Sequence, residues 1–408
     1  MYYGWYVVGG ALLSQVAMVG FFTYVFSLLV LPLQADFGAS RTEVMYSMSL
    51  STILGLFVAP AVGFMADKYP IRWLMSAGAV IFGAGLYMLS MTQTLVQFTL
   101  LFGLVMAVSN QLLGPICGTA TITRWFTDNR GKALGLSATG SSFGGMLLPV
   151  LFVSWLGENG DWRGALQNLS YGVILILLPY LVLVMRDAES QSASEASAAE
   201  PNADAPAQTG VVSNDYSLKD IVKHPAYWII GVSIALLFST YSALLANLTP
   251  YISGQGLDKG IAAQTIMILA ISGLIGKLLF GYAADKISLR LALTITQGAV
   301  ITGLVLLAIE PSYPVIAVAI IITGLSTGGM LPVWSALLAA IFGTASYGRV
   351  MGLMMPLIVL IVMPGYSLAG YLFDLSGSYS LCFYIFSAAI AVSMPLVALL
   401  KMPTLRQQ

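Results

Sequence analysis

Lys277 is the residue best placed to bind a charged substrate. It is the only charged residue well inside an apolar run, and the runs contain no Asp or Glu to pair with it. A charged side chain in hydrocarbon costs at least ~2.5 kcal/mol, so its presence there indicates a function. An ammonium without an acidic partner is neutralised best by an anionic substrate. The position of Lys277 therefore predicts a binding site for a small carboxylate.

The helix positions around Lys277 indicate which way it faces. Small residues share its predicted helix face at steps of three and four, namely Ala270, Gly273, Gly281 and Ala284. A stripe of small residues faces protein or a cavity rather than lipid. Asp285 ends the run eight residues later, about 12 Å along a helix, which places Lys277 near the membrane midplane. The alternative is a lysine that extends to the headgroups at the nearer membrane surface.

Two decapeptides repeat one pattern of possible gating residues. "GFMADKYPIR" begins at Gly63 and "GYAADKISLR" begins at Gly281, an offset of 281 − 63 = 218. "RGKALGL" and "YGRVMGL" repeat in the same way, and their glycines at 131 and 348 are 217 residues apart. Two repeated segments with nearly the same offset predict a duplicated unit. Alternatively, Gly-Ala-Asp-Lys is a sequence that is simply common in loops. The candidate gating residues are Gly63, Asp67, Lys68, Arg72, Gly281, Asp285, Lys286, Arg290, Arg130, Gly131, Gly348 and Arg349.

Composition predicts a membrane protein that holds these residues on spanning helices. Hydrophobic residues make up 58% of the 408 positions and charged residues 8%, whereas soluble domains have roughly 25% charged residues. A spanning helix needs about 20 apolar residues, and twelve such runs are present. They cover 5–32, 44–66, 72–91, 95–122, 133–156, 164–185, 226–253, 260–284, 289–309, 313–340, 350–373 and 380–400.

The runs form two sets of six, separated by a polar segment. Residues 187–215 are rich in Ala, Ser, Pro and acids and contain no Lys or Arg, a composition typical of disorder. We therefore expect an all-α protein with an N-terminal bundle at 1–186, a largely disordered linker at 187–224 and a C-terminal bundle at 225–408. Because six is even, the two bundles should be parallel repeats with a pathway between them.

The positive charges orient the chain in the membrane. With both termini cytoplasmic, the outer loops carry three basic residues, Arg41, Arg163 and Lys259, and the cytoplasmic side carries thirteen. They are Lys68, Arg72, Arg124, Arg130, Lys132, Arg186, Lys219, Lys223, Lys286, Arg290, Arg349, Lys401 and Arg406. This bias predicts cytoplasmic termini in a multi-pass protein of the plasma membrane.

The decapeptide at Gly63 resembles the loop signature of the major facilitator superfamily, Gly-x-x-x-Asp-Arg/Lys-x-x-x-Arg, and the decapeptide at Gly281 resembles its second copy. Further segments are similar to the monocarboxylate and oxalate/formate porter group. They are "GWYVV", "FGASRTEV", "TRWFTDNRGKALGLSATGSSFGG", "DWRGAL", "HPAYW", "LTPYISGQG" and "GKLLFGYAADK". The resemblance covers nearly the whole chain except the linker.

The resemblance implies a latch on the cytoplasmic side. Asp67 and Asp285 would each meet the N-terminus of a helix from the other half, where unpaired N–H groups and the helix dipole favour a carboxylate by roughly 0.3 to 2 kcal/mol. Such contacts would exist only while that side is closed. Alternatively, each aspartate caps its own turn.

The resemblance also implies substrate-facing aromatic residues at Tyr24 and Trp334. Three amides inside the apolar runs, Asn110, Gln111 and Asn247, are further pocket candidates, although such residues also hold helices together. This chain departs from the group because it has Lys277 where arginine is usual and Gly254 where an acid is often found. The second cation of the oxalate exchangers is missing near Met354, which argues against a dicarboxylate.

The expected function is secondary active transport of a small organic anion by alternating access, with proton symport favoured over exchange. The alternatives are an anion exchanger, or a carrier of a neutral, zwitterionic or hydrophobic solute with a structural Lys277. An embedded enzyme would need a His or acid cluster, and a sensor would need a signalling domain. We expect no enzymatic activity, no cofactor, metal or nucleic-acid partner, and function as a monomer in the bilayer with protons as possible co-substrates. Cys117 and Cys382 are predicted to be small apolar residues.

Overall fold

The computed structural model describes residues 2–126, 130–157, 160–186, 217–283, 287–309 and 312–400. Within these ranges the chain is almost entirely helical, and twelve helices are long and apolar enough to cross a membrane. They fall into two sets of six, one on each side of the segment 187–216. The predicted all-α fold with two six-helix bundles is confirmed.

The N-terminal bundle contains six spans: three are single helices, one is broken into two helices, and two include a π-helical turn. Its elements are α1 (Gly4–Val19), the π-helical turn η1 (Gly20–Val25), α2 (Phe26–Phe37), α3 (Arg41–Lys68), α4 (Ile71–Ser90), α5 (Leu95–Leu113), α6 (Pro115–Trp125), α7 (Arg130–Leu156), α8 (Trp162–Gly172), η2 (Val173–Leu177) and α9 (Leu178–Leu183).

The C-terminal bundle follows a short helix that precedes the seventh span. Its elements are α11 (Leu218–Lys223), α12 (Pro225–Ala246), α13 (Leu248–Gly254), α14 (Lys259–Ala283), α15 (Leu289–Ala308), α16 (Tyr313–Ser376) and α17 (Ser380–Ala398). α11 falls inside the range 187–224 that the sequence assigns to the linker. The rest of that segment, 187–216, lies outside the described residues.

Local sequence explains where several helices begin and turn. α3 begins with a capping box in which the Ser40 hydroxyl accepts from the Glu43 backbone N–H and the Glu43 carboxylate accepts from the Ser40 backbone N–H, so two unpaired donors are satisfied. α16 contains two spans joined at Gly343, whose φ of 78° and ψ of 164° interrupt the helix. Only glycine adopts this positive φ without strain. The tenth and eleventh spans are therefore joined by a sharp turn.

Two spans are broken where hydropathy predicts continuous runs. The fourth span changes from α5 to α6 at Gly114, whose backbone is extended, and the seventh changes from α12 to α13 at Asn247. Breaks in spanning helices are tolerated where protein or a cavity surrounds the freed backbone groups. Hydropathy records only apolar content, so it cannot detect them.

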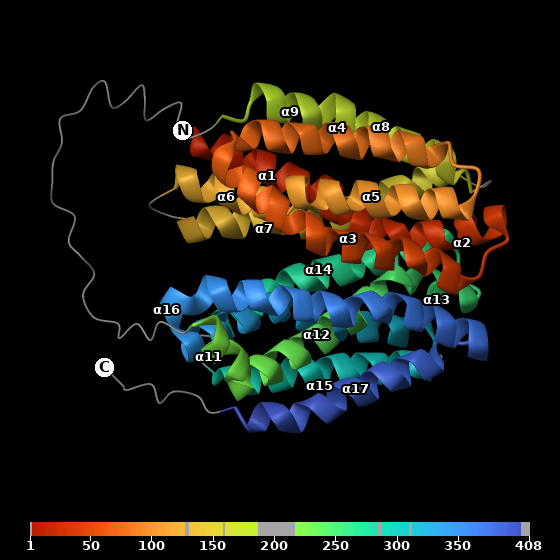
Figure 1. Cartoon of the computed structure of the whole chain (residues 1–408). Coiled ribbons are helices and arrows are strands. Elements are labelled where there is room, and N and C mark those ends of the chain that lie inside the picture. Colours follow the sequence, from red (N-terminus) through yellow and green to blue (C-terminus); the bar gives the residue numbers. More distant parts are fainter. Residues whose placement is uncertain are drawn as a thin grey trace, which may run out of the picture.

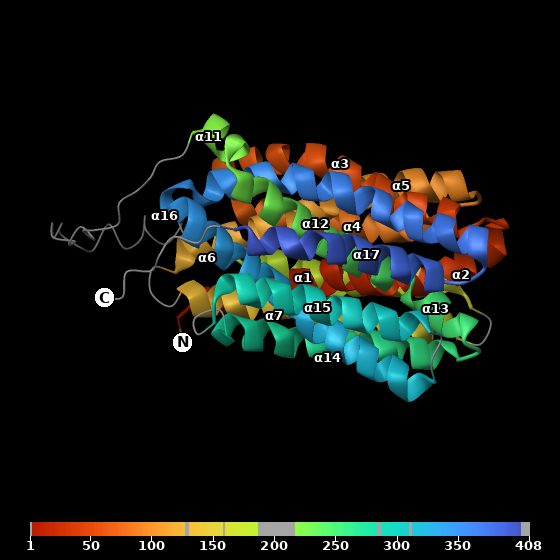
Figure 2. The same cartoon turned by 90° about the horizontal axis from the view of Figure 1, so that it is seen from below.

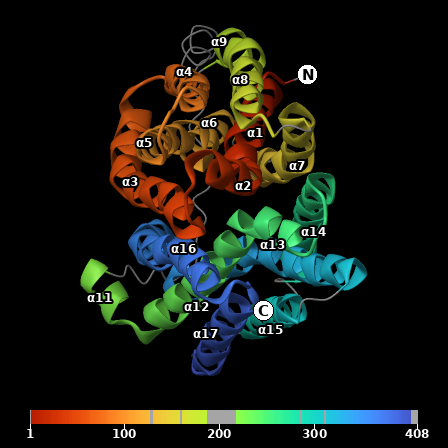
Figure 3. The same ribbon diagram turned by 90° about the vertical axis from the view of Figure 1, so that its right-hand side faces the viewer.

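The two bundles lie side by side, as Figure 3 shows from one end. α1 begins and α17 ends on the same side of the molecule (Figures 1 and 2), which we call the terminal face; the opposite side is the distal face. α3 packs against α16, and α7 packs against α14. These two helix pairs form most of the boundary between the halves, with further contacts of α12 and α13 against η1 and α2, and the candidate site lies along it.

Candidate functional site

Lys277 contacts the opposite half of the protein. Its ammonium Nζ donates to Ser141 Oγ at 2.9 Å and to Ser142 Oγ at 3.2 Å. Lys277 is on α14 and the serines are on α7, so the contact joins the two bundles. The side chain is partly buried. The ammonium does not extend toward the headgroups at the terminal face.

The position of the serines along α7 fixes the depth of the ammonium. Ser141 is the twelfth residue of the 27-residue helix α7, so the contact lies near the middle of that helix. Helical side chains lean toward the N-terminus of their own helix, and α14 begins at the distal face. The lean carries Nζ farther from the terminal face than the Lys277 backbone.

A close approach of α16 holds the Lys277 backbone in place. A Cβ atom added to Gly328 would lie 2.9 Å from the Lys277 backbone nitrogen. Any larger residue at 328 would push α14 away, because small residues permit such close helix packing. The lysine is thus presented by a rigid helix pair within the C-terminal half.

Tyr24 also lies at the boundary between the halves. Its hydroxyl is 3.4 Å from the hydroxyl of Tyr241 on α12, and the side chain is only 6% exposed. A Cβ added to Gly145 would lie 2.8 Å from the Tyr24 ring and 2.7 Å from the Cβ of Ala270. Gly145 is one turn from Ser141, and Ala270 is two turns from Lys277. Tyr24 and Lys277 therefore line the same α7–α14 contact.

The predicted amides of the fourth span lie just before its break. Asn110 and Gln111 are both partly exposed, and Gln111 Nε2 donates a long hydrogen bond of 3.5 Å to the Gly55 carbonyl. Among the described residues, no contact joins either amide to Lys277 or Tyr24. They remain candidates on the N-terminal half.

Asn247 and Trp334 have partners that account for their polar groups. Asn247 is 2% exposed; its side-chain carbonyl accepts from the Tyr379 hydroxyl at 2.9 Å and its amide donates to the Ala243 carbonyl at 2.9 Å. Trp334 is 1% exposed, and its indole N–H donates to Met354 Sδ at 3.4 Å. In this conformation Trp334 holds helices of the C-terminal half together, whereas Asn247 also reaches the N-terminal half, because its amide donates to Met45 Sδ at 3.8 Å.

The predicted gating residues are described only in part. Gly63 faces open space, with no atom within 4 Å of an added Cβ, Lys68 lies 4.2 Å from the Phe64 ring and Arg72 lies 4.5 Å from the Trp73 ring. Arg290 and Arg349 lie near the starts of the ninth and eleventh spans. Asp285 and Lys286 lie outside the described residues, as do the side chains of Asp67 and Arg130. Gly131, Gly281 and Gly348 are in helical backbone. The cytoplasmic latch therefore stays a prediction.

Arg124 anchors the end of α3, a contact that the sequence did not reveal. Its guanidinium donates to the Ala66 carbonyl at 2.7 Å, one residue before Asp67. A cation that caps the last carbonyls of a helix stabilises its C-terminus. This bond ties the fourth span to the predicted gating loop within the N-terminal half.

Hydroxyl groups close the distal side of the boundary. Ser27 Oγ and Thr249 Oγ1 are 2.7 Å apart, and Ser49 Oγ lies 2.9 Å from Ser367 Oγ and 3.0 Å from the Met363 carbonyl oxygen. Each of these bonds crosses from one half to the other. The distal face is closed in this conformation.

A carboxylate adds to this closure. Asp374, near the end of α16, accepts from the Arg41 backbone N–H at 3.3 Å, the Thr42 backbone N–H at 3.0 Å and the Thr42 hydroxyl at 2.5 Å. The Arg41 guanidinium lies 3.3 Å from the Phe373 ring centre. A Cβ added to Gly370 would lie 2.9 Å from Thr42 Cα. The first turn of α3 is thus held by one face of α16.

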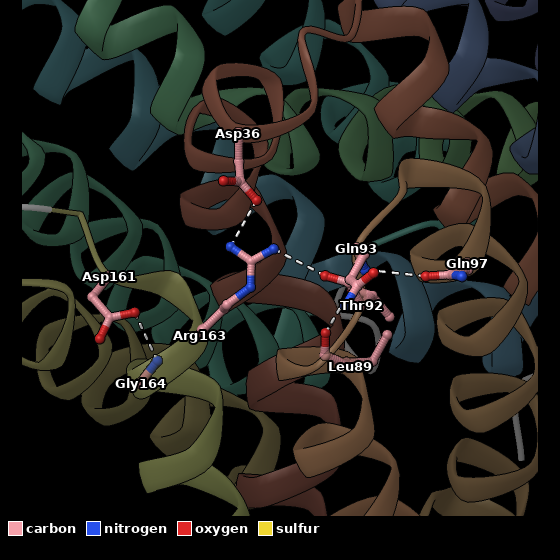
Figure 4. A network of polar contacts seen from close by, with 8 residues as sticks. All are labelled: Asp36, Leu89, Thr92, Gln93, Gln97, Asp161, Arg163 and Gly164. Carbon is pink, nitrogen blue, oxygen red and sulfur yellow. Dashed lines mark hydrogen bonds and ion pairs between the residues drawn. The ribbon is translucent and has the colours of Figure 1, made fainter.

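Arg163 fixes the distal end of the N-terminal half (Figure 4). Its guanidinium forms an ion pair of 2.7 Å with Asp36 and donates to the Thr92 carbonyl at 2.9 Å. It also lies 4.3 Å from the Trp162 ring. These contacts join the ends of the first, third and sixth spans at the distal face.

Sequence reasoning missed three residues of the candidate site, namely Tyr241, Ser141 and Ser142. Tyr24 and Tyr241 differ by 217 positions, the offset of the repeated glycines, so the repeat could have indicated the second tyrosine. Ser141 and Ser142 occur in the glycine-rich stretch of α7, a composition that close helix packing explains. No local pattern marks them as partners of Lys277.

Two parallel six-helix bundles with a polar contact at mid-depth between them define a membrane carrier built from repeats. The profile of the Major Facilitator Superfamily matches residues 11–312 and 271–407. The chain belongs to this superfamily of non-enzymatic carriers.

Curated relatives and solved structures agree with this assignment. The chain is 24% identical to Monocarboxylate transporter 13 of Bos taurus over 415 residues, covering 100% of this chain and 92% of the relative. It is also 24% identical to the oxalate:formate antiporter of Oxalobacter formigenes over 81% of this chain and 76% of the relative. A bacterial homolog of the human lysosomal transporter Spinster, in an inward-facing and occupied conformation, matches with a TM-score of 0.73 at 15% identity. That match covers 97% of this chain and 93% of the other and shows the shared fold.

Proposed function

We propose that the protein is a secondary active transporter of a small organic monocarboxylate. The observation that carries the proposal is Lys277, whose ammonium lies at mid-depth between the halves and bonds only to neutral hydroxyls in the described part of the chain. An ammonium held by hydroxyls keeps its positive charge available to an anion, whereas one paired with a carboxylate does not. The curated relatives named for monocarboxylates and for oxalate and formate support the same substrate class.

Transport would proceed by alternating access. The hydroxyl contacts and Asp374 close the distal side here. Substrate would reach Lys277 from the terminal side in this conformation, and breaking the distal contacts would open the other route. The excess of basic residues on the terminal side supports a cytoplasmic orientation in the plasma membrane.

Proton symport is the coupling mode we favour, with anion exchange as the alternative. The chain lacks a carboxylate at Gly254, so Lys277 itself would have to exchange the proton. Substrate binding favours the protonated lysine, and release on the other side favours its deprotonation. The coupled cycle would then carry one proton with one monocarboxylate.

Uptake into proteoliposomes tests the proposal. Purified protein would be reconstituted and assayed with labelled formate, acetate, lactate and pyruvate, beside the neutral amides of the last three acids as matched solutes. We expect saturable uptake of at least one acid and none of its amide, lost in Lys277→Ala. Equal uptake of acid and amide, or full activity of Lys277→Ala, would show that the lysine is structural and that the carrier takes an uncharged solute.

A further inference from the structure

The hydroxyl of Ser142 differs from the other hydroxyls of α7. Ser137, Thr139, Ser141 and Ser154 each donate to the carbonyl three residues earlier in the helix. Ser142 accepts from Lys277, but within the described residues no acceptor is recorded for its own proton. It is also only 1% exposed. A buried donor left unpaired is costly, so this proton needs a partner that the protein itself does not supply.

Lys277 likewise has a donor left over. An ammonium carries three N–H donors, and two of them are directed at Ser141 and Ser142. The third N–H and the Ser142 O–H come from atoms 3.2 Å apart. A carboxylate has two acceptor oxygens about 2.2 Å apart, as fixed by ordinary covalent geometry, so it can accept one bond from each donor.

We propose that Ser142 is the second ligand of the substrate carboxylate, with one carboxylate oxygen on Lys277 Nζ and the other on the Ser142 hydroxyl. This inference rests on the proposed function and extends it to a residue of the N-terminal half. Lys277 already polarises the Ser142 oxygen by donating to it, which makes the hydroxyl proton a better donor. The substrate then supplies the acceptor that Ser142 lacks.

The arrangement makes the substrate a bridge between the two halves. Ser142 is on α7 and Lys277 is on α14, and Gly145 and Ala270 already bring these helices into contact. A carboxylate bound to both residues would hold α7 and α14 together while the other helix pairs rearrange. A primary amide has only one acceptor oxygen, so it could not accept from the two residues through two separate oxygens.

Ser141 provides a matched control. It is the nearer acceptor for Lys277, at 2.9 Å, but its own proton is already donated to the Ala138 carbonyl. Ser141→Ala and Ser142→Ala therefore each remove one hydrogen-bond acceptor of Lys277. Only Ser142→Ala also removes a hydroxyl proton that has no acceptor in the described part of the protein. The two variants separate binding of the substrate from positioning of the lysine.

The test is isothermal titration of the purified full-length protein with formate, acetate, lactate and pyruvate. We expect Ser142→Ala to raise the Kd of the bound acid about tenfold, as for loss of a hydrogen bond to a charged group. Ser141→Ala should raise the Kd by a smaller factor than Ser142→Ala, because it removes a bond that positions Lys277 but no donor to the substrate. Ser142→Thr should retain most of the affinity because it keeps the hydroxyl. Melting temperatures without ligand establish that each variant is folded.

Two results would overturn the inference but not the proposed function, provided that Lys277→Ala abolishes binding. The first is unchanged affinity in Ser142→Ala. The second is an equal loss of affinity in Ser141→Ala and Ser142→Ala. Affinity retained by Lys277→Ala, or no binding of any of the four acids to the wild-type protein, would overturn the proposed function and the inference together.

Discussion

The carboxylate of Asp374 caps a helix that belongs to the other half of the molecule. It accepts three hydrogen bonds from Arg41 and Thr42 at the start of α3, although α3 already has its own capping residue, Ser40. A carboxylate at a helix N-terminus interacts favourably with the unpaired N–H groups and the helix dipole. Here the same interaction spans the boundary between the halves, so it exists only while the distal face is closed.

Replacing Asp374 with alanine should favour opening of the distal face. Loss of a cap costs about 1 kcal/mol, which shifts a two-state equilibrium about fivefold. The measurement is the rate at which a cysteine at position 27 reacts with an impermeant maleimide applied from the distal side. Asp258→Ala is the control, because Asp258 caps its own helix by accepting from Ile261. Equal reaction rates in the two variants would contradict a role for Asp374 in closure.

A disulfide between positions 49 and 367 should lock the distal face. Ser49 Oγ and Ser367 Oγ are 2.9 Å apart, so paired cysteines at these sites should oxidise readily. The native Cys117 and Cys382 are both buried and should not compete. We expect oxidation to stop transport and reduction to restore it, with each single cysteine variant unaffected. Full transport by the crosslinked protein would show that these helices need not separate.

Lys277→Ala should abolish carboxylate binding and leave the protein folded, since the change removes a costly ion from the bundle interior. Lys277→Arg should keep part of the activity, because the charge remains while the planar guanidinium forms a different set of hydrogen bonds. Uptake and melting temperature measure the two effects separately. Lys259→Ala is the control on the same helix and should transport normally. Loss of folding in Lys277→Ala would instead indicate a structural lysine.

An imposed proton gradient should drive accumulation of the substrate. If Lys277 carries the proton, liposomes that are acidic outside should concentrate the acid, and collapse of the gradient with an ionophore should reduce uptake to equilibration. Preloading the liposomes with unlabelled acid is the comparison that detects exchange. Stimulation by preloading together with indifference to the gradient would establish exchange and exclude symport.

Deletion of Ser190 to Gln208 should leave transport largely intact. The segment has a polar and acidic composition, from which we expect no contribution to the packing of the bundles, and its removal still leaves residues between the bundles to connect them. Initial uptake rates normalised to protein in the membrane provide the measurement. A slower rate at normal abundance would reveal a regulatory role for the linker.

Sequence could predict the parts of the structure that depend on local composition. Apolar runs about 20 residues long located all twelve spans, and Lys277, which the sequence distinguishes as a charge inside an apolar run, lies at the boundary between the halves. The helix breaks at Gly114 and Asn247 were not predicted, because an apolar run can be one helix or two. The contact of Asp374 with α3 was not predicted either, because no sequence pattern distinguishes this residue from others at the end of a span.

The partners of Lys277 could not be predicted for a different reason. Ser141 and Ser142 meet the lysine only because α7 and α14 pack together, and that contact depends on how the two halves are placed. The repeat offset relates residues that are equivalent by symmetry, such as Tyr24 and Tyr241. It gives no information about pairs such as Ser142 and Lys277, which occupy different helices of the repeat.

The π-helical turn at Gly20–Val25 means that the first span is not a single stiff rod. A turn of this kind widens the helix and is a common place for it to bend. Tyr24 lies on the turn, and Ser27, which bonds to Thr249 across the boundary, follows two residues after it. The segment Phe26–Phe37 can therefore tilt while Gly4–Val19 stays in place. Helix flexing at this joint would let the distal end of the first span respond to an occupied site without displacement of its whole bundle.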